Sequence, residues 1–372
     1  MKILIINTLY YPYKVGGAEV SVQLLAEGLV REGHNVRVLC LHEKDEKKID
    51  IINNVEIHYL PLKNIFWPFD NKERSFFKKL LWHIIDYYNF SMKSIVNKEI
   101  ESFKPHVVHT NNISGFSVSV WDVVKFHKIR LVHTARDYYL FHRHGNLFEK
   151  GKILSSDNLL VKIRSKLKVK HTKKVDFFVG ISKFIQDFHI ENNMFKTKKS
   201  TFIYNSVNKI NKNFINNDRK TIGFIGRLTE DKGFNIFCNI ALNNSDKYDF
   251  CAAGNFSNHD KDRFKLMADR SNVKILGFIT FKEFIDKVDC VILPVQWNEP
   301  FGRVVVESAL AGINVYTNKI GGISELFKYF DNILEIGDDL KVENNFFSYD
   351  EVKVSVFTTK HVVKSYLKIY ES

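Results

Sequence analysis

The chain has 372 residues, of which 45% are hydrophobic, so it is long enough for about two domains with cores of their own. No stretch approaches the ~20 apolar residues of a membrane-spanning helix, which argues against an integral membrane protein. Lysine and arginine exceed aspartate and glutamate by 55 − 42 = 13, which favours an anionic partner: a phosphorylated substrate, an anionic lipid or a nucleic acid.

The N-terminal sequence and the cysteines both favour the cytoplasm. The chain starts with the apolar run KILIIN and lacks the basic and apolar regions of a signal peptide. The cysteines lie in apolar contexts without metal-like spacing, which is typical of reduced core residues. They are at positions 40, 238, 251 and 290. We expect a cytoplasmic protein, with peripheral contact to the inner face of the plasma membrane as an alternative.

Residues 1–41 predict a parallel β-α-β unit. Lys2–Asn7 and Asn35–Leu41 are apolar runs typical of buried strands, and Ala18–Arg31 has the period of an amphipathic helix. Gly16 and Gly17 precede that helix, where glycine lets a ligand approach the backbone and helix N–H groups favour an anion. A tight turn without a ligand explains the pair equally well, because the G-x-G-x-x-G spacing of a dinucleotide fold is absent.

Val55–Leu60 predicts a further strand, and Arg74–Phe103 predicts one long helix. The helical pattern contains FFKKLLWHIIDYYNF, which is apolar and aromatic around much of its circumference. We expect a core helix packed against the sheet. The alternative is an interfacial helix that touches a membrane or a lipid-linked acceptor.

Polar side chains follow two more predicted strands, His106–Thr110 and Arg130–Thr134. Ligands of open α/β sheets bind beyond the carboxyl ends of the strands, so Arg136 and Asp137 are candidate site residues. Arginine donates hydrogen bonds to hydroxyls and phosphate but cannot act as a base. His133, three residues earlier, would lie at the strand end and is the weaker candidate.

Residues 141–174 alternate basic and apolar side chains, as in LLVKIRSKLKVKHTKK. This pattern is typical of a membrane-surface helix and equally of a solvated helix, so both interpretations stay open. Nucleic-acid binding is disfavoured because no recognition motif accompanies the charge.

Two strands, Phe177–Ile181 and Thr201–Tyr204, complete the first half, with Ser182 as the N-cap of the helix between them. The polar stretch Asn208–Lys220 has the composition of an interdomain linker. We therefore predict a first domain at 1–205, a second at 206–355 and a terminal helix within 356–372.

A second α/β repeat starts with the strand Thr221–Ile225. The loop after it places Arg227 and Lys232 between glycines at a strand end, where a guanidinium can clamp a diphosphate and an ammonium adds a point charge. A later predicted strand, Val273–Leu276, leads into Gly277 and Phe278.

The stretch DCVILPVQWNEPFGRVVVESALAGINVYT holds two glutamates at a strand-to-helix switch. Glu299 precedes the predicted helix and Glu307 lies inside it. Each carboxylate can accept hydrogen bonds from a diol, while the helix start at Phe301 and Gly302 favours an anion. Diol, anion, diol is the layout of a nucleotide sugar: ribose, diphosphate, hexose. The alternative is a pair of solvated surface charges.

The two glutamates, with seven residues between them and Pro-Phe-Gly after the first, resemble the donor-site signature of glycosyltransferase family 4. The run GRLTEDKG at 226–233 is similar to the diphosphate loop of this family, and GGAE at 16–19 and GGISEL at 321–326 are similar to two further loops. The resemblance implies an α/β, GT-B fold of two Rossmann-like domains facing across a cleft, with the C-terminal helix crossing back to the first domain.

The resemblance also implies a function. It predicts a retaining hexosyltransferase that moves a sugar from a nucleotide-diphosphate donor to a glycan or lipid-linked hydroxyl acceptor, without a metal or other cofactor. Synthesis of a bacterial surface polysaccharide, O-antigen or capsule, is the expected setting. No nucleic-acid partner is expected, whereas an anionic membrane surface is a candidate partner.

The residue roles follow from the same resemblance. Arg227 and Lys232 would bind the diphosphate, Glu307 the ribose and Glu299 the hexose. The remaining expected donor contacts are Phe301 and Gly302 through backbone N–H groups, Gly277 and Phe278 beside the base, and Gly16 and Gly17 near the phosphates. Arg136, with Asp137, would position the hexose, although Arg136 stands where family members commonly have histidine.

Two other functions stay open. The same fold serves nucleotide-sugar epimerases, which would exchange hydrogen at the sugar C2 without an acceptor. The chain could also be a non-catalytic adaptor on the membrane surface in polysaccharide assembly, which would bind anionic vesicles without turning over a donor.

Overall fold

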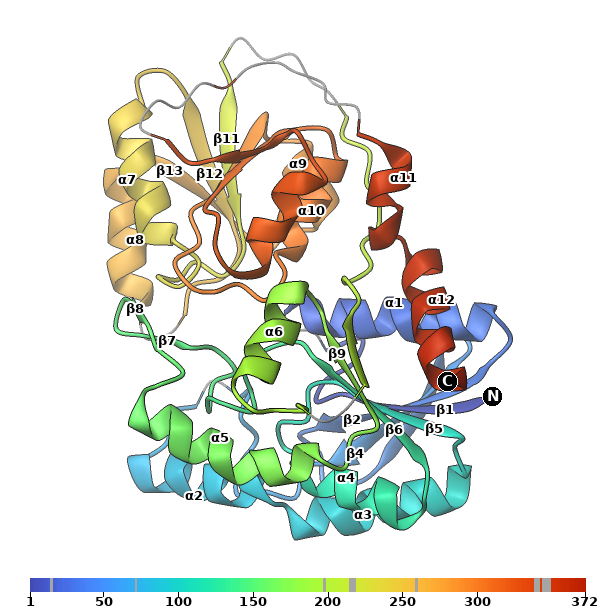
Figure 1. The fold of residues 1–372 in the computed structure, drawn as a ribbon. Coiled ribbons are helices and arrows are strands. Elements are labelled where there is room, and N and C mark those ends of the chain that lie inside the picture. Colours follow the sequence, from blue (N-terminus) through green and yellow to red (C-terminus); the bar gives the residue numbers. More distant parts are fainter. Residues whose placement is uncertain are drawn as a thin grey trace. The chain divides into compact units, whose positions relative to one another are not determined.

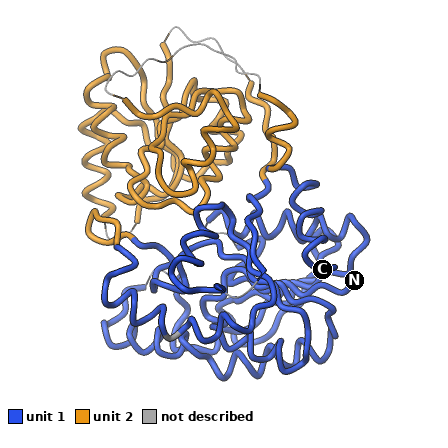
Figure 2. Tube along the Cα trace, in the orientation of Figure 1, with its two compact units in different colours: residues 1–147, 155–206, 357–372 blue, residues 148–154, 207–356 orange. Residues whose placement is uncertain are grey.

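The computed structural model describes residues 1–13, 16–70, 72–196, 199–213, 219–257, 260–337, 342 and 349–372. Figure 2 shows the two compact units of the chain, with residues 1–147, 155–206 and 357–372 in unit 1 and residues 148–154 and 207–356 in unit 2. Part of the predicted linker (214–218) and part of the first glycine loop (14–15) lie outside the described residues.

Unit 1 contains an eight-stranded sheet in the order β10-β9-β6-β5-β1-β2-β4-β3 (Figure 1). All neighbouring strands are parallel except β3, an unpredicted edge strand that runs antiparallel to β4. The strands are β1 (Lys2–Ile6), β2 (Asn35–His42), β3 (Lys48–Ile52), β4 (Val55–Pro61), β5 (Val107–Thr110), β6 (Arg130–Ala135), β9 (Phe177–Gly180) and β10 (Lys199–Phe202).

Seven helices of unit 1 are described. They are α1 (Gly17–Arg31), α2 (Phe76–Tyr87), α3 (Phe90–Phe103), α4 (Ser119–Phe126), α5 (Leu159–Thr172), α6 (Lys183–Glu191) and α12 (Thr359–Glu371). The terminal helix α12 packs on α1 so closely that a Cβ on Gly28 would lie 2.5 Å from Cγ2 of Val363. Tyr366 and Tyr370 bring α12 into the same apolar core as Val22 and Leu25 of α1.

The prediction of one long core helix over 74–103 was wrong. The stretch forms two helices, α2 and α3, separated at Tyr88 and Asn89. The Asn89 side chain accepts a hydrogen bond from the Met92 amide at 3.0 Å, so it caps α3 and starts a new helix. While α3 buries a regular apolar face, α2 buries only Trp82 and Asp86.

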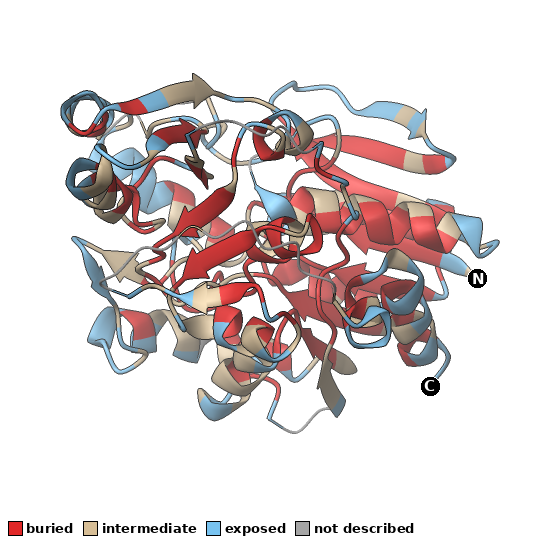
Figure 3. Cartoon of the chain, turned by 90° about the horizontal axis from the view of Figure 1, so that it is seen from above, coloured by how far each residue is buried: buried red, intermediate tan, exposed pale blue. Residues whose placement is uncertain are grey.

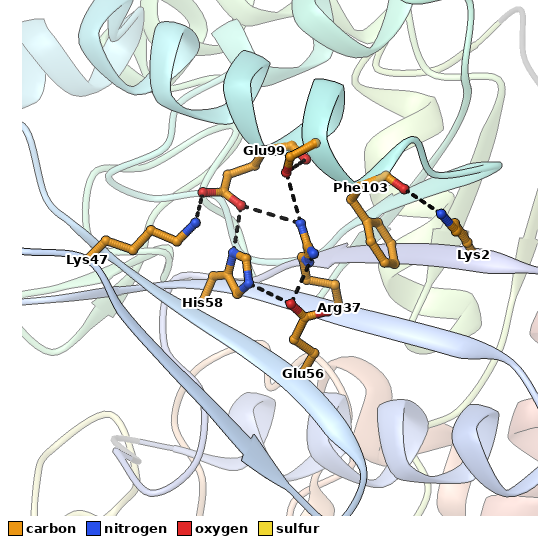
Figure 4. Close-up of polar contacts among 8 residues, drawn as sticks. Lys2, Arg37, Lys47, Glu56, His58, Glu99 and Phe103 are labelled. Atoms are coloured by element: carbon orange, nitrogen blue, oxygen red, sulfur yellow. Dashed lines mark hydrogen bonds and ion pairs between the residues drawn. The ribbon is translucent and has the colours of Figure 1, made fainter.

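A cluster of charged side chains joins α3 to the sheet (Figure 4). Glu99 of α3 is 5% exposed and accepts hydrogen bonds from His58 Nδ1 at 2.6 Å and from Lys47. Arg37 of β2 lies 3.7 Å from the same carboxylate and donates to Glu56 of β4 at 3.0 Å. Burial raises the pKa of Glu99, but the hydrogen bonds from His58 and Lys47 outweigh it and hold the pKa below its usual value.

Unit 2 contains a six-stranded parallel sheet in the order β13-β12-β11-β14-β15-β16. Its strands are β11 (Thr221–Ile225), β12 (Asp249–Ala253), β13 (Val273–Gly277), β14 (Cys290–Leu293), β15 (Asn314–Thr317) and β16 (Ile333–Glu335). Its helices are α7 (Phe234–Asn244), α8 (Lys261–Arg270), α9 (Phe281–Ile285), α10 (Arg303–Leu310), the 3₁₀ helix η1 (Gly321–Lys328) and α11 (Glu351–Val354), with the short 3₁₀ turn η2 (Ser355–Phe357) after it.

The core of each unit lies along its sheet. Strands of both sheets are buried, while the helices expose their outer sides (Figure 3). All four cysteines are buried and unbridged, which confirms them as reduced core residues. Within the described residues, no helix combines the length and the hydropathy needed to cross a bilayer.

A short hairpin differs from the predicted domain division. Sequence placed residues 148–154 in the first domain, whereas the structure assigns them to unit 2. They form β7 (Phe148–Glu149) and β8 (Lys152–Ile153), joined through Gly151 in a left-handed conformation. A Cβ on Gly151 would lie 3.3 Å from Oε1 of Glu230. Because these two residues are far apart in the sequence, no local pattern predicts their contact.

Candidate functional site

The carboxyl ends of β11 and β14 define a site edge in unit 2. These strands are neighbours, yet β11 leads to β12 on its other side, so the strand order reverses at this point. Ligands of open α/β sheets bind at such switch points. The two loops are joined there, since the Gln296 amide donates to the Asp231 carbonyl at 2.9 Å and Gln296 Nε2 donates to the Glu230 carbonyl at 2.7 Å.

Gly233 allows this close approach. Its φ is +80°, and a Cβ there would lie 1.8 Å from the carbonyl oxygen of Pro294, at the end of β14. No side chain fits between two backbones at that distance, so glycine is required. The approach fixes Lys232, the preceding residue, against the β14 loop.

The predicted cations and Glu299 lie at this edge together. Lys232 Nζ is 2.5 Å from Glu299 Oε2 and 5.0 Å from the centre of the Trp297 ring. Arg227 donates to Asp231 Oδ2 at 2.8 Å, and its side chain stays 54% exposed while Asp231 is nearly buried. Asp231 therefore holds a solvent-accessible guanidinium in the loop that also carries Lys232.

The second glutamate lies at the start of α10. Gly302 is the N-cap in a left-handed conformation (φ +86°), and a Cβ there would lie 2.7 Å from Ile323. Arg303 is the first residue of the helix and lies 2.8 Å from Glu307, one turn further along. Burial raises the pKa of Glu307, and the Arg303 guanidinium acts against that rise. A carboxylate has two oxygens and about four lone-pair sites, so Glu307 can accept further hydrogen bonds beside Arg303.

The η1 segment fixes the loop before α10. The Gly322 amide donates to the Glu299 carbonyl at 2.8 Å, and a Cβ on Gly321 would lie 2.5 Å from the same oxygen. The GGISEL run therefore holds the backbone of Glu299, while Phe301 beside it is buried.

Gly277 and Phe278 lie at the end of β13. The Gly254 amide donates to the Gly277 carbonyl at 2.8 Å, which aligns the ends of β12 and β13. Phe278 is 83% exposed, so an aromatic ring is available at the same strand edge for stacking.

Unit 1 has a small pocket at the carboxyl ends of β5 and β6. It is lined by Asn111, Asn112, His133, Ala135, Arg136, Asp137, Tyr139, Leu140 and His189. Arg136 is 7% exposed and donates to Asn111 Oδ1 at 2.9 Å and to Asn205 Oδ1 at 2.5 Å. Two amide oxygens thus fix a buried guanidinium at the strand ends.

Asp137 lies beside Arg136 in a buried group of charges. Its carboxylate accepts a hydrogen bond from the Tyr139 amide at 2.8 Å. Burial raises the pKa of Asp137 to about 6, with Glu19 raising it further and Lys168 and Arg136 lowering it. Asp86 of α2 is also buried, and its pKa is likewise raised to about 6.

Lys168 of α5 interacts with this group. Its side chain is buried, donates to the Tyr139 carbonyl at 2.8 Å and lies 3.6 Å from the centre of the Tyr139 ring. Burial lowers the pKa of Lys168 to about 8, against the attraction of Asp86 and Asp137. One lysine of the basic stretch is therefore internal and supports the loop that follows Arg136.

Two other predicted features have different surroundings. Gly16 caps α1 in an extended conformation and donates to Glu19 Oε2 at 2.9 Å, so its backbone does not require glycine. His133 is a core residue: its ring stacks on Phe195, and burial lowers its pKa to about 3. Within the described ranges no group of three or more His, Cys, Asp or Glu side chains has the arrangement of a metal site.

The two units are both Rossmann-like, and their combination is the GT-B fold. Two solved structures share it over the whole chain: sucrose-phosphate synthase from Thermosynechococcus elongatus (TM-score 0.72, 13% identity, 98% of that chain) and Anabaena HepE in complex with UDP and glucose (TM-score 0.71, 16% identity, 100% of that chain). At these identities the likeness shows the fold alone.

The chain belongs to glycosyltransferase family 4. Residues 15–209 match the family described as Glycosyltransferase Family 4, and residues 206–338 match Glycosyl transferases group 1. An uncharacterised 42.6 kDa protein in the cps region of Klebsiella pneumoniae is 44% identical over the full length of both chains. An uncharacterised glycosyltransferase from Methanocaldococcus jannaschii is 26% identical over 88% of this chain and 83% of its own.

Several residues of the two site edges were not singled out from sequence. Asp231 and Arg303 are four residues from their partners, so the i,i+4 spacing could have indicated them. Asn111 and Asn205 are 25 and 69 residues from Arg136, and no local signal links them. The inward orientation of Lys168 was likewise hidden in a repeating basic pattern.

Replacing Lys168 with methionine tests the buried group of charges. Lys168 lowers the pKa values of Asp86 and Asp137, so both should rise further in the variant. An acid whose pKa is raised on folding loses its stabilising effect as pH increases through that pKa. The loss of stability relative to wild type should therefore widen as pH rises above about 6. It should widen again above about pH 8, because the folded wild type releases the Lys168 proton there while the unfolded chain still holds it.

Denaturant unfolding at several pH values measures this effect. Lys170→Met, an exposed lysine on the same helix, is the matched control and should leave the pH dependence unchanged. A constant difference between Lys168→Met and wild type from pH 5 to 8 would contradict the charge coupling.

Proposed function

We propose that this glycosyltransferase moves a hexose from a nucleotide-diphosphate sugar to a hydroxyl acceptor, with retention at the anomeric carbon. The contact of Lys232 with Glu299 at 2.5 Å carries the proposal. It joins a cation suited to phosphate and an acid suited to sugar hydroxyls, at the strand edge where α/β sheets bind ligands.

Each donor component has a partner in unit 2. Arg227 and Lys232 bind the diphosphate and stabilise the charge that develops as it leaves. Glu307 accepts hydrogen bonds from the ribose diol, and Glu299 from the hexose. Backbone N–H groups at Phe301 and Gly302 supplement the phosphate contacts, and Phe278 and Gly277 flank the base.

In unit 1, the Arg136 pocket binds sugar hydroxyls. Arg136 donates, and Asp137 accepts once it is ionised. The roles of Gly16 and Gly17 near the phosphates stay predictions. Transfer forms the bond between the acceptor oxygen and the anomeric carbon, breaks the bond from that carbon to the diphosphate oxygen, and passes the proton of the acceptor hydroxyl to the departing diphosphate. Because two side-chain cations supply the positive charge, we propose that no metal or other cofactor takes part.

The similarity to a cps-region protein supports capsule polysaccharide as the product, with a glycan or lipid-linked acceptor. The Anabaena protein solved with UDP and glucose supports uracil as the first nucleobase to test.

A thermal-stability screen against UDP, GDP and ADP sugars tests donor binding. A ligand at ~100 times its Kd should stabilise the protein by ~2.7 kcal/mol, so one nucleotide series should raise the unfolding temperature. The corresponding nucleoside monophosphate is the control and should give a much smaller increase. Absence of a shift with all three sugar series would contradict donor binding.

A further inference from the structure

Two helices of unit 1, α2 and α5, leave large apolar side chains exposed. On α2, Phe76, Phe77 and Ile84 are 68%, 78% and 60% exposed; on α5, Leu159 and Leu160 are 71% and 70% exposed. Of 20 large hydrophobic side chains exposed among the described residues, eight lie on these two helices. Such a concentration marks an interaction surface, whereas scattered apolar side chains do not.

The two helices are neighbours, so their exposed side chains belong to one region. The Tyr139 hydroxyl donates to the Asp86 carbonyl of α2 at 3.2 Å, and its own carbonyl accepts from Lys168 of α5. At these same C-terminal ends, the rings of Tyr88 and His171 are 5.6 Å apart. Figure 1 shows α5 running alongside α2. We name this region the α2–α5 face; its apolar residues are Phe76, Phe77, Leu80, Leu81, Ile84, Leu159, Leu160 and Ile163.

The α2–α5 face is basic as well as apolar. The only acid on either helix is Asp86, which is buried. Exposed lysines accompany the apolar side chains; they are Lys78 and Lys79 on α2, Lys162, Lys166 and Lys170 on α5, and Lys173 just after α5. Lysines around an apolar stripe are the arrangement of helices that lie in the interface of a bilayer. A second copy of the chain would instead bring like charges together.

We propose that the α2–α5 face binds an anionic lipid bilayer, with the aromatic and aliphatic side chains in the headgroup region and the lysines on lipid phosphates. Binding at this surface does not depend on the donor site of unit 2, so the two proposals stand or fall separately. It would place the enzyme where a lipid-linked acceptor is found.

Vesicle flotation of the full-length protein tests the proposal. The probes are vesicles of phosphatidylcholine alone and of phosphatidylcholine with 30% phosphatidylglycerol, in 0.1 and 0.5 M NaCl. Wild type should bind the anionic vesicles at least tenfold more tightly than the neutral ones, and less tightly at high salt. Phe76→Ser/Phe77→Ser and Lys166→Glu/Lys170→Glu should each weaken binding at least tenfold.

Matched controls change similar side chains on other helices. Leu242→Ser/Leu266→Ser and Lys247→Glu/Lys265→Glu alter exposed residues of unit 2 and should bind as wild type does. If both α2–α5 variants bind the anionic vesicles as tightly as wild type does, the proposal is overturned. It is also overturned if only the charge-reversal variant loses binding, because the apolar side chains would then have no role. Sedimentation velocity that shows a dimer, lost in Phe76→Ser/Phe77→Ser, would assign the face to self-association instead.

Discussion

Replacing Lys232 or Arg227 with alanine should lower donor turnover by about 10²-fold or more. Each would remove a cation aimed at the diphosphate, and loss of one preorganised donor of this kind costs about 10²–10³ in kcat. Lys232 is fixed by Gly233 against the β14 loop and lies 2.5 Å from Glu299, so its charge needs little reorganisation to act on the leaving group.

Steady-state turnover of the donor chosen by the thermal screen measures this effect. Lys265→Ala, an exposed lysine on α8, is the control and should retain wild-type turnover. Circular dichroism establishes that each variant folds. Wild-type rates in both Arg227→Ala and Lys232→Ala would refute their role at the diphosphate.

Replacing Glu99 with alanine should reduce the free energy of unfolding by about 3–5 kcal/mol. Removing one partner of a buried ion pair leaves the others uncompensated, and Glu99 is the acceptor that His58 and Lys47 share (Figure 4). Because its pKa is lowered on folding, Glu99 stabilises the protein above its usual pKa, and this contribution disappears as pH falls through the lowered value.

Chemical denaturation of the full chain, from neutral pH downward, follows the loss. Glu101→Ala, two residues further along α3 and exposed, should cost less than about 0.5 kcal/mol. The difference in the free energy of unfolding between Glu99→Ala and wild type should become smaller as the pH is lowered. A neutral-pH loss as small as that of Glu101→Ala would show that the cluster contributes little.

The sheet strands were predictable because buried parallel strands are short apolar runs separated by helical periods. The break between α2 and α3 also had a local signal, since Asn89 is a favoured N-cap residue inside an otherwise continuous pattern. The exposure of Phe76 and Phe77 had no local signal in the sequence. A helix that is apolar on most sides is usually buried, and only the tertiary structure shows which side meets the sheet.

The features of the candidate site were likewise only partly predictable from the sequence. The positions of Arg227, Lys232 and Glu299 at one strand edge followed from the predicted order of strands, loops and helices, whereas their roles stay predictions. The pairing of Lys232 with Glu299 spans 67 residues and was not predictable from spacing. Lys168 looked like its neighbours in the basic stretch, and its burial depends on Tyr139, far away in the sequence.

The central claim is that a nucleoside diphosphate lies along the β11 and β14 strand ends with its ribose on Glu307. Calorimetry tests this claim by measuring the Kd of UDP and of 2′-deoxy-UDP for wild type and for Glu307→Gln. If the thermal screen selects GDP or ADP, the corresponding pair of nucleotides is used. Wild type should bind the deoxy nucleotide roughly tenfold or more weakly, since a hydrogen bond to a charged group contributes about 1.5–3 kcal/mol. The variant should bind both nucleotides with similar affinity; the wild-type ratio preserved in Glu307→Gln would contradict the account.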